Sequence, residues 1–142
     1  MKQFMMIAAL ALAAQVQAQN PVPQTGQPVK TRVVMQVSDN DSGKWSLALA
    51  NARNLQKSLG AANVDIEIVA YGPGIGMVKA DSPAAANVRE AVASGMAINA
   101  CENTMAAQHL SKAEMNPAAG YVPSGVVEIV TRQQNGYAYL RP

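Results

Sequence analysis

Cys101 is the only cysteine of the chain, and its position makes it the first candidate for chemistry. It follows the apolar run of residues 96–100 and precedes the polar residues Glu102, Asn103 and Thr104, a change that is typical of a helix start. The unpaired N–H groups and the dipole at a helix N-terminus stabilise a thiolate, the nucleophilic form of cysteine. Asn103 and Thr104 can donate hydrogen bonds to the sulfur, whereas the Glu102 carboxylate would raise the pKa of the thiol if it points toward it.

The second chemical group is His109, the only histidine, which a cysteine–histidine dyad would need. If both residues lie on one helix, the eight positions between them span about 12 Å along the axis, whereas hydrogen-bond reach is about 3 Å. We therefore expect an exposed histidine at a helix end. One cysteine and one histidine fall short of the three or four ligands of a zinc site, and a lone thiol closes no internal disulfide. We predict no metal and no cofactor.

The elements that must position these residues alternate between strands and helices. Hydrophobic periodicity predicts strands over residues 33–37, 64–70, 96–100, 121–123 and 137–140, and helices over residues 44–59, 84–94, 102–110 and 125–134. Ser82 with Pro83, and Ser124, are predicted to begin the second and fourth helices. Strands that alternate with helices build a parallel sheet with helices on both faces, so the sequence predicts a doubly wound α/β domain.

Open parallel sheets bind ligands at the carboxyl ends of their strands, where four predicted loops meet, over residues 38–43, 71–76, 101–104 and 123–125. The glycines of the second loop lack the spacing of a dinucleotide site, so we expect tight turns that line a small pocket. Asp39 and Asp41 are expected to cap the following helix rather than to act as acids or bases. The candidate pocket and support residues around Cys101 are Ser38, Asp39, Gly72, Gly74, Asn103, Thr104, Pro123 and Ser124.

The N-terminal residues 1–18 have the build of a secretory signal peptide, with Lys2, an apolar stretch from Phe4 to Ala14 and the small-residue motif Val16-Gln17-Ala18. The apolar stretch is shorter than the about 20 residues that cross a bilayer, so no membrane span is expected in the mature chain. We expect an exported, periplasmic protein. Residues 19–31, rich in Pro and Gln, are predicted to be an extended tether to one domain over residues 32–142.

The composition argues against a nucleic-acid partner. The formal net charge is only +2, acidic and basic residues are interspersed, and aromatic residues make up 4% of the chain. A nucleic-acid surface usually shows a basic patch, often with aromatic side chains that stack on bases. We therefore expect protein or small-molecule partners.

Three segments resemble the DsrE/DsrF-like family of sulfur-relay proteins: residues 100–105 (ACENTM), 121–129 (YVPSGVVEI) and 136–142 (GYAYLRP). The resemblance covers nearly the whole predicted domain. It implies a three-layer α/β fold with a five-stranded, mostly parallel sheet, assembly into homo-oligomers (trimers or hexamers), and a cysteine that carries sulfur as a persulfide. Carried over to this sequence, Cys101 is the position that would take sulfur from a donor protein and pass it to an acceptor.

Two functions therefore remain open. In the first, Cys101 is a reactive thiol and the protein is a sulfur carrier, at most a sulfurtransferase-like enzyme. In the second, the domain is a non-catalytic module that binds a small ligand or assembles with other proteins, and Cys101 only lines its pocket, as free cysteines are often buried for packing.

Overall fold

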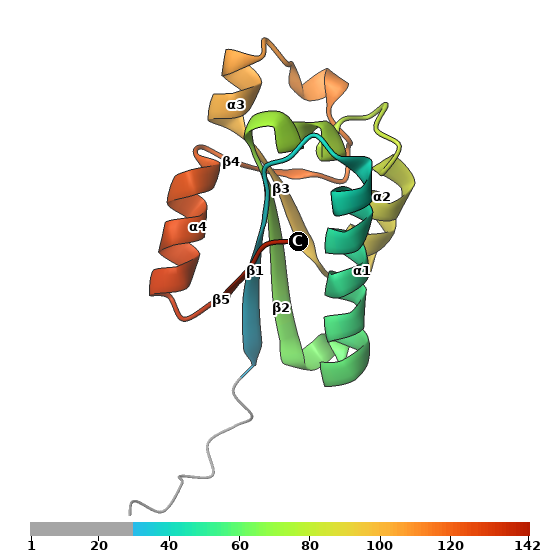
Figure 1. Ribbon diagram of the computed structural model, residues 1–142, viewed down its shortest axis with the longest axis vertical. Coiled ribbons are helices and arrows are strands. Elements are labelled where there is room, and N and C mark those ends of the chain that lie inside the picture. The colour runs from blue at the N-terminus through green and yellow to red at the C-terminus, as the bar shows by residue number, and fades with distance from the viewer. Residues whose placement is uncertain (1–29) are drawn as a thin grey trace, which may run out of the picture.

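Five parallel strands form one sheet in the order β4-β3-β2-β1-β5 (Figure 1). The computed structural model describes residues 30–142, so the predicted signal peptide and nearly all of the predicted tether lie outside the described residues. The strands are β1 (Thr31–Val37), β2 (Val64–Ala70), β3 (Ala97–Cys101), β4 (Gly120–Val122) and β5 (Ala138–Leu140). The helices are α1 (Ser42–Leu59), α2 (Ala85–Ala93), α3 (Glu102–Ala107) and α4 (Gly125–Gln134), with 3₁₀ helices η1 (Ala61–Asn63), η2 (Gly72–Val78) and η3 (Lys112–Glu114).

The sheet lies between two helical layers, which confirms the three-layer, doubly wound α/β prediction. Helices α1 and α2 cover one face and α4 covers the other, while α3 stands at the edge where the strands end (Figure 1). All strand pairs are parallel, because each crossover carries a helix that returns the chain to the same end of the sheet. The carboxyl ends of β1, β2, β3 and β4 therefore meet at one edge, as the sequence predicted.

Two apolar clusters hold the layers together. The larger one fills the space under α1 and α2, where α1 contributes Trp45, Ala48, Leu49 and Ala52 at the spacing of one helical face. The smaller one, under α4, consists of Val34, Val69, Val122 and Ile129. Burial on both faces explains the continuous apolar stretches 33–35 in β1 and 68–70 in β2.

The ends of α1 follow the sequence signals. Asp41 is its N-cap, and the Asp41 carboxylate accepts hydrogen bonds from the N–H groups of Gly43 and Lys44 at 2.8 and 3.1 Å. Gly60 ends the helix with φ +87°, a backbone conformation that favours glycine. The prediction that Asp39 also caps this helix is wrong, because its carboxylate forms ion pairs instead.

The start of α2 differs from the prediction. Ser82 and Pro83 lie in a turn before the helix, where the Ser82 hydroxyl accepts from the Ala84 N–H at 3.1 Å and the Ser82 carbonyl accepts from the Ala85 N–H. The helix itself begins at Ala85. A short serine side chain that bonds the backbone two residues on favours a turn as readily as a cap, so the same residue types fit both arrangements.

The glycine-rich segment after β2 forms the 3₁₀ helix η2 rather than a simple turn. Gly74 packs directly on the backbone of β1, where a Cβ atom would collide with the Val37 carbonyl oxygen. The absence of a side chain at Gly74 therefore lets η2 lie flat against the end of β1.

Candidate functional site

Cys101 ends β3 and is at the same time the N-cap of α3. Its sulfur accepts hydrogen bonds from two backbone N–H groups, that of Thr104 at 3.4 Å and that of Gly125 at 3.2 Å. Thr104 belongs to the first turn of α3, and Gly125 is the first residue of α4. The starts of two helices therefore converge on one sulfur atom. The sequence predicted only the contact with the start of α3.

The contact from α4 depends on the lack of a side chain at Gly125. A Cβ atom there would lie 3.0 Å from Tyr71 Cβ, 3.1 Å from Val69 Cγ1 and 3.3 Å from Cys101 Cβ. These distances are tighter than ordinary van der Waals contact, so a larger residue would push the start of α4 away from the sulfur. The sequence predicts the loop in which Gly125 lies, but no sequence pattern indicates that the Gly125 N–H donates to Cys101.

A second link ties α3 to the end of β2. The Thr104 hydroxyl oxygen accepts from the Gly72 N–H at 2.9 Å, and the Gln108 side-chain amide donates to the Gly72 carbonyl oxygen at 3.2 Å. Gly72 is thus held through both its N–H and its carbonyl group, by the side chains of Thr104 in α3 and of Gln108 at the C-cap of that helix. Because the Thr104 hydroxyl oxygen accepts from Gly72, its hydrogen remains available to the Cys101 sulfur.

The electrostatic result is a lowered pKa for the Cys101 thiol. Burial acts in the opposite direction and is the largest single influence, but the hydrogen bonds together outweigh it. The lowering influences are, in decreasing order, the Thr104 hydroxyl and the backbone N–H groups of Gly125, Thr104 and Asn103. The Asn103 N–H lies near the sulfur, but its hydrogen bond goes to the Pro123 carbonyl oxygen. The lowered pKa favours the thiolate.

Glu102 does not oppose this effect in the way the sequence allowed. Its carboxylate forms an ion pair with Lys112, with Oε1 and Nζ 3.2 Å apart. The Lys112 ammonium also lies over the ring of Tyr121, 4.4 Å from the ring centre. Glu102 is thus engaged on the side of η3 and is not among the main influences on the pKa of Cys101.

Access to the sulfur is narrow. Cys101 is 4% exposed, and the residues that close around it include Thr104, Gly125 and the side chains of Val69 and Tyr71 next to Gly125. A reagent therefore reaches the sulfur only through a small opening or after a local movement of its cover.

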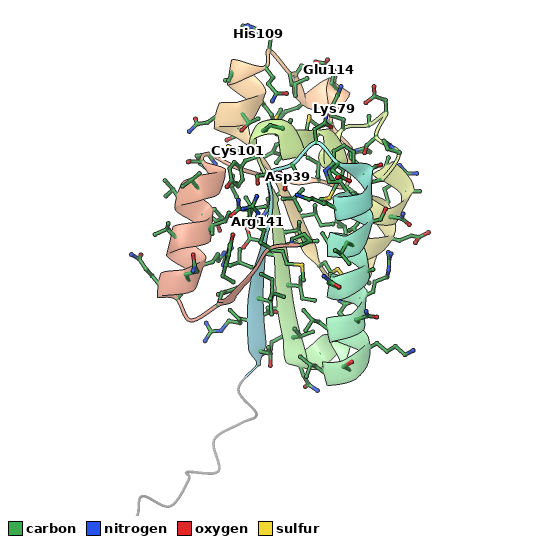
Figure 2. The ribbon with its side chains drawn as sticks, in the orientation of Figure 1. Asp39, Lys79, Cys101, His109, Glu114 and Arg141 are labelled. Carbon is green, nitrogen blue, oxygen red and sulfur yellow. The ribbon has the colours of Figure 1, made fainter. Side chains whose placement is uncertain are left out.

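His109 lies apart from Cys101, as expected for an exposed residue at a helix end. Helix α3 ends at Ala107, and His109 follows with φ +56° and an exposed side chain. Figure 2 shows His109 at the outer end of this segment, pointing away from Cys101. The two residues form no dyad.

The remaining predicted support residues divide into two groups. Beside Cys101, the Asn103 N–H donates to the Pro123 carbonyl oxygen at 3.1 Å and joins α3 to the loop after β4. Ser124 occupies the N-cap position of α4, but its hydroxyl makes no capping hydrogen bond.

The second group lies at the end of β1. The Ser38 hydroxyl accepts from the Gln36 side chain at 3.1 Å. The Asp39 carboxylate pairs with Lys44 at 2.9 Å and with Arg141 at 3.5 Å, which places it beside the C-terminal segment (Figure 2). These contacts, the hydrogen bond from Lys44 above all, hold the pKa of Asp39 below its usual value. Ser38 and Asp39 share the sheet edge with Cys101 but have no direct contact with it among those described.

A cavity of about 390 Å³ lies beside η2. Pro73 and Gly76 line it, whereas Cys101 does not, so the glycine segment borders a pocket other than the one expected around the sulfur. The other lining residues are Asn40, Ile75, Lys79 and Gln108.

Residues 30–142 contain neither a candidate metal-binding cluster nor a candidate membrane span. No three His, Cys, Asp or Glu side chains in this range are grouped so that they could bind a metal ion. No helix in the same range combines the length and the hydropathy that a membrane span requires.

Comparison with known proteins places this geometry in a family. The model of the DsrE/DsrF-like family matches residues 31–142. The solved structure of a protein of unknown function from Methanobacterium thermoautotrophicum is 36% identical over 79% of this chain and 99% of its own, with a TM-score of 0.75. A conserved protein of unknown function from Bacteroides thetaiotaomicron shares the fold, at 14% identity over 82% and 99% of the two chains and a TM-score of 0.67. No curated protein matches the chain.

Proposed function

The chain belongs to the DsrE/DsrF-like family, which is related to sulfur relay, and on this basis we propose that it carries sulfane sulfur as a persulfide on Cys101. The observation that supports the proposal most directly is the pair of backbone N–H groups, from Thr104 and Gly125, that donate to the Cys101 sulfur. Hydrogen bonds to sulfur stabilise the thiolate that must attack a sulfur donor.

On the protein, the chemistry uses only the Cys101 thiol and the N–H groups that donate hydrogen bonds to it. The Cys101 thiolate attacks the outer sulfur of a donor such as thiosulfate, a new S–S bond forms, and sulfite leaves with the electron pair of the bond that breaks. In the second half of the cycle an acceptor thiolate attacks the outer sulfur of the persulfide. Cys101 then leaves as a thiolate, which the same N–H groups stabilise.

Intact-mass measurement tests the proposal. The reduced protein is incubated with polysulfide or thiosulfate, desalted and weighed, beside the Cys101→Ser variant. We expect an increase of about 32 Da, the mass of one sulfur atom, that is absent in the variant and is reversed by dithiothreitol. A wild-type protein that gains no sulfur, although its thiol reacts with iodoacetamide, would refute the proposal.

One observation favours the alternative of a non-catalytic binding or assembly module, although in a form in which Cys101 does not line the pocket. Cys101 is 4% exposed and does not line the cavity of about 390 Å³ beside η2. In that case the sulfur fills space under α4, and the ligand or partner is recognised elsewhere on the sheet edge. The mass experiment separates the two functions, because a module of this kind takes up no sulfur.

Export and self-assembly are further parts of the proposal. The signal-peptide pattern of residues 1–18 supports a periplasmic location, which cell fractionation with and without these residues would test. The outer face of α4 exposes Val126, Val127 and Val130, a surface that a homo-oligomer would bury. Light scattering of the wild type and of the Val127→Asp variant should show an oligomer that the substitution weakens, and a monomeric wild type would contradict this part.

A further inference from the structure

Helix α4 is attached to the sheet at both of its ends. At its start, the Gly125 N–H donates to the Cys101 sulfur at 3.2 Å. In its last turn, the guanidinium of Arg132 reaches the sheet, where its Nε lies 2.5 Å from Oε2 of Glu67 on β2. Between these points only Ile129 of α4 is buried, so apolar packing alone holds the helix weakly.

The attachment at the end of α4 is a buried polar network. Glu67 is 3% exposed, and its Oε1 accepts from the Asn99 side-chain amide at 2.7 Å. The Nε–H of Arg132 is donated to Glu128 Oε1 at 2.7 Å, so Glu67 Oε2 has the Arg132 charge beside it but accepts no hydrogen bond within the described residues. Arg132 also stacks near the ring of Tyr137, 5.2 Å from its centre. The pair therefore depends on the exact place of the guanidinium.

The same network reaches the strand that carries the sulfur. Asn99 lies two residues before Cys101 on β3, so both side chains point to the α4 face of the sheet. Gly120 of β4 leaves the room for the Asn99 side chain, because a Cβ atom at Gly120 would collide with the Asn99 amide oxygen. One face of β3 is thus linked to both ends of α4. Cys101 contacts the start of the helix. Asn99 is linked to the last turn of the helix through Glu67 and Arg132.

From this arrangement we propose that Glu67 and Arg132 are positioning residues for Cys101: their ion pair holds the end of α4 on the sheet and so keeps the Gly125 N–H within hydrogen-bond distance of the sulfur. Neither residue touches the sulfur among the described contacts. The proposal rests on the proposed function for its biological meaning, but its physical content is a property of the unmodified thiol.

The Glu67→Gln substitution separates a positioning role from a direct electrostatic effect, because the two shift the pKa of the Cys101 thiol in opposite directions. Loss of a nearby negative charge, acting through space, lowers the pKa of a thiol or leaves it unchanged. Release of α4, in contrast, removes a hydrogen bond to the thiolate and raises that pKa. An upward shift therefore has only the positional explanation.

The experiment measures the rate of Cys101 alkylation by iodoacetamide as a function of pH, with the full-length protein. For Glu67→Gln we expect the midpoint of the titration to rise by roughly one pH unit, the size expected for the loss of one hydrogen bond to a charged group. The rate at the high-pH plateau should also rise, because the start of α4 covers the sulfur. The matched control is Glu90→Gln, an exposed glutamate on α2, which should leave both values unchanged.

Arg132→Lys provides a second variant in case Glu67→Gln unfolds. It keeps the positive charge but not the planar guanidinium, so a rise of the midpoint again reports position rather than charge. Thermal unfolding of each variant identifies those that are folded. An unchanged or lowered midpoint in a folded variant would overturn the proposal. The persulfide assay is independent: a wild type that takes up no sulfur would refute the carrier function and leave the midpoint shift standing.

Discussion

The first N–H group of α4, that of Gly125, donates to the sulfur of Cys101, which lies 24 residues earlier in the chain. This contact joins helix α4 to the sheet at the edge where β3 and β4 end. It also gives the single thiol of the chain a donor from a second helix, in addition to those of α3.

Thr104→Val should raise the titration midpoint of Cys101. The substitution keeps the shape of the side chain but removes the hydroxyl group that lowers the pKa of the thiol and that accepts from the Gly72 N–H. We expect an upward shift of up to about one pH unit in the alkylation rate profile. Thr104→Ser retains the hydroxyl and is the matched control, so an equal shift in both variants would argue against the hydrogen bond as the cause.

Gly125→Ala should destabilise the protein and weaken the activation of Cys101. The added Cβ would meet Tyr71, Val69 and Cys101 at 3.0 to 3.3 Å, so α4 must shift outward. Overpacking of this kind costs about 1–3 kcal/mol of unfolding free energy, measurable by urea denaturation. Gly43→Ala is the comparison, because a Cβ there meets a single side-chain oxygen, that of the N-cap Asp41 at 3.1 Å, so it should leave the titration midpoint of Cys101 unchanged. An alanine at 125 that leaves both stability and the midpoint unchanged would contradict the close contact.

Arg132→Met should destabilise the folded state by about 2 kcal/mol, less than for a fully buried ion pair because Arg132 is partly exposed. Burial already raises the pKa of Glu67, against the lowering effects of Asn99 and Arg132, and without Arg132 the rise grows. A carboxyl whose folded pKa is raised destabilises the folded state only while it is ionised. The loss should therefore be full at neutral pH and vanish as the pH falls below the unfolded pKa of about 4.3.

Urea denaturation of Arg132→Met at neutral pH and near pH 4 gives the two values to compare. The double variant Glu67→Gln, Arg132→Met is the control and should regain most of the lost stability, since it buries no unpaired charge. A loss that is the same at both pH values would show that Arg132 acts by packing instead.

Asp39→Asn should lower stability at neutral pH but not in acid. Because the pKa of Asp39 is depressed, chiefly by the hydrogen bond from Lys44, its ion pairs stabilise the folded state above the unfolded pKa of about 3.9. This contribution is lost as the pH falls through the folded pKa. Thermal unfolding across this range should show the two proteins converging, and Asp81→Asn, whose side chain is 80% exposed, should match the wild type throughout.

The order of strands and helices could be predicted because each element carries its own pattern. The face of α1 shows in the spacing of Trp45, Ala48, Leu49 and Ala52, and its ends show in Asp41 and Gly60. Periodicity is a local property, so it can be recognised without knowledge of the rest of the chain. The position of Cys101 before α3 is local in the same sense, and it was confirmed.

Where the prediction failed, two structures compete for the same residue types. The glycines of η2 have no periodicity, and only the close approach of Gly74 to the Val37 backbone explains their arrangement. Asp39 looks like a cap, but its ion pairs with Lys44 and Arg141 decide its role, and Arg141 comes from the other end of the chain. The structure of such residues depends on contacts with distant parts of the chain, which the local sequence does not reveal.

The sequence by itself therefore determined the parallel α/β sheet, the single thiol at the start of a helix and the family. Apolar periodicity, capping residues and family motifs are local patterns, and each can be recognised within a short segment. Only the tertiary structure decided which donors surround that thiol. The Gly125 N–H reaches Cys101 because β3 and β4 are paired, and α4 is held by Glu67 and Arg132 because β2 lies beneath it. The chemistry of Cys101 depends on contacts between residues far apart in the chain, whose distances are set by the packing of the sheet and its helices.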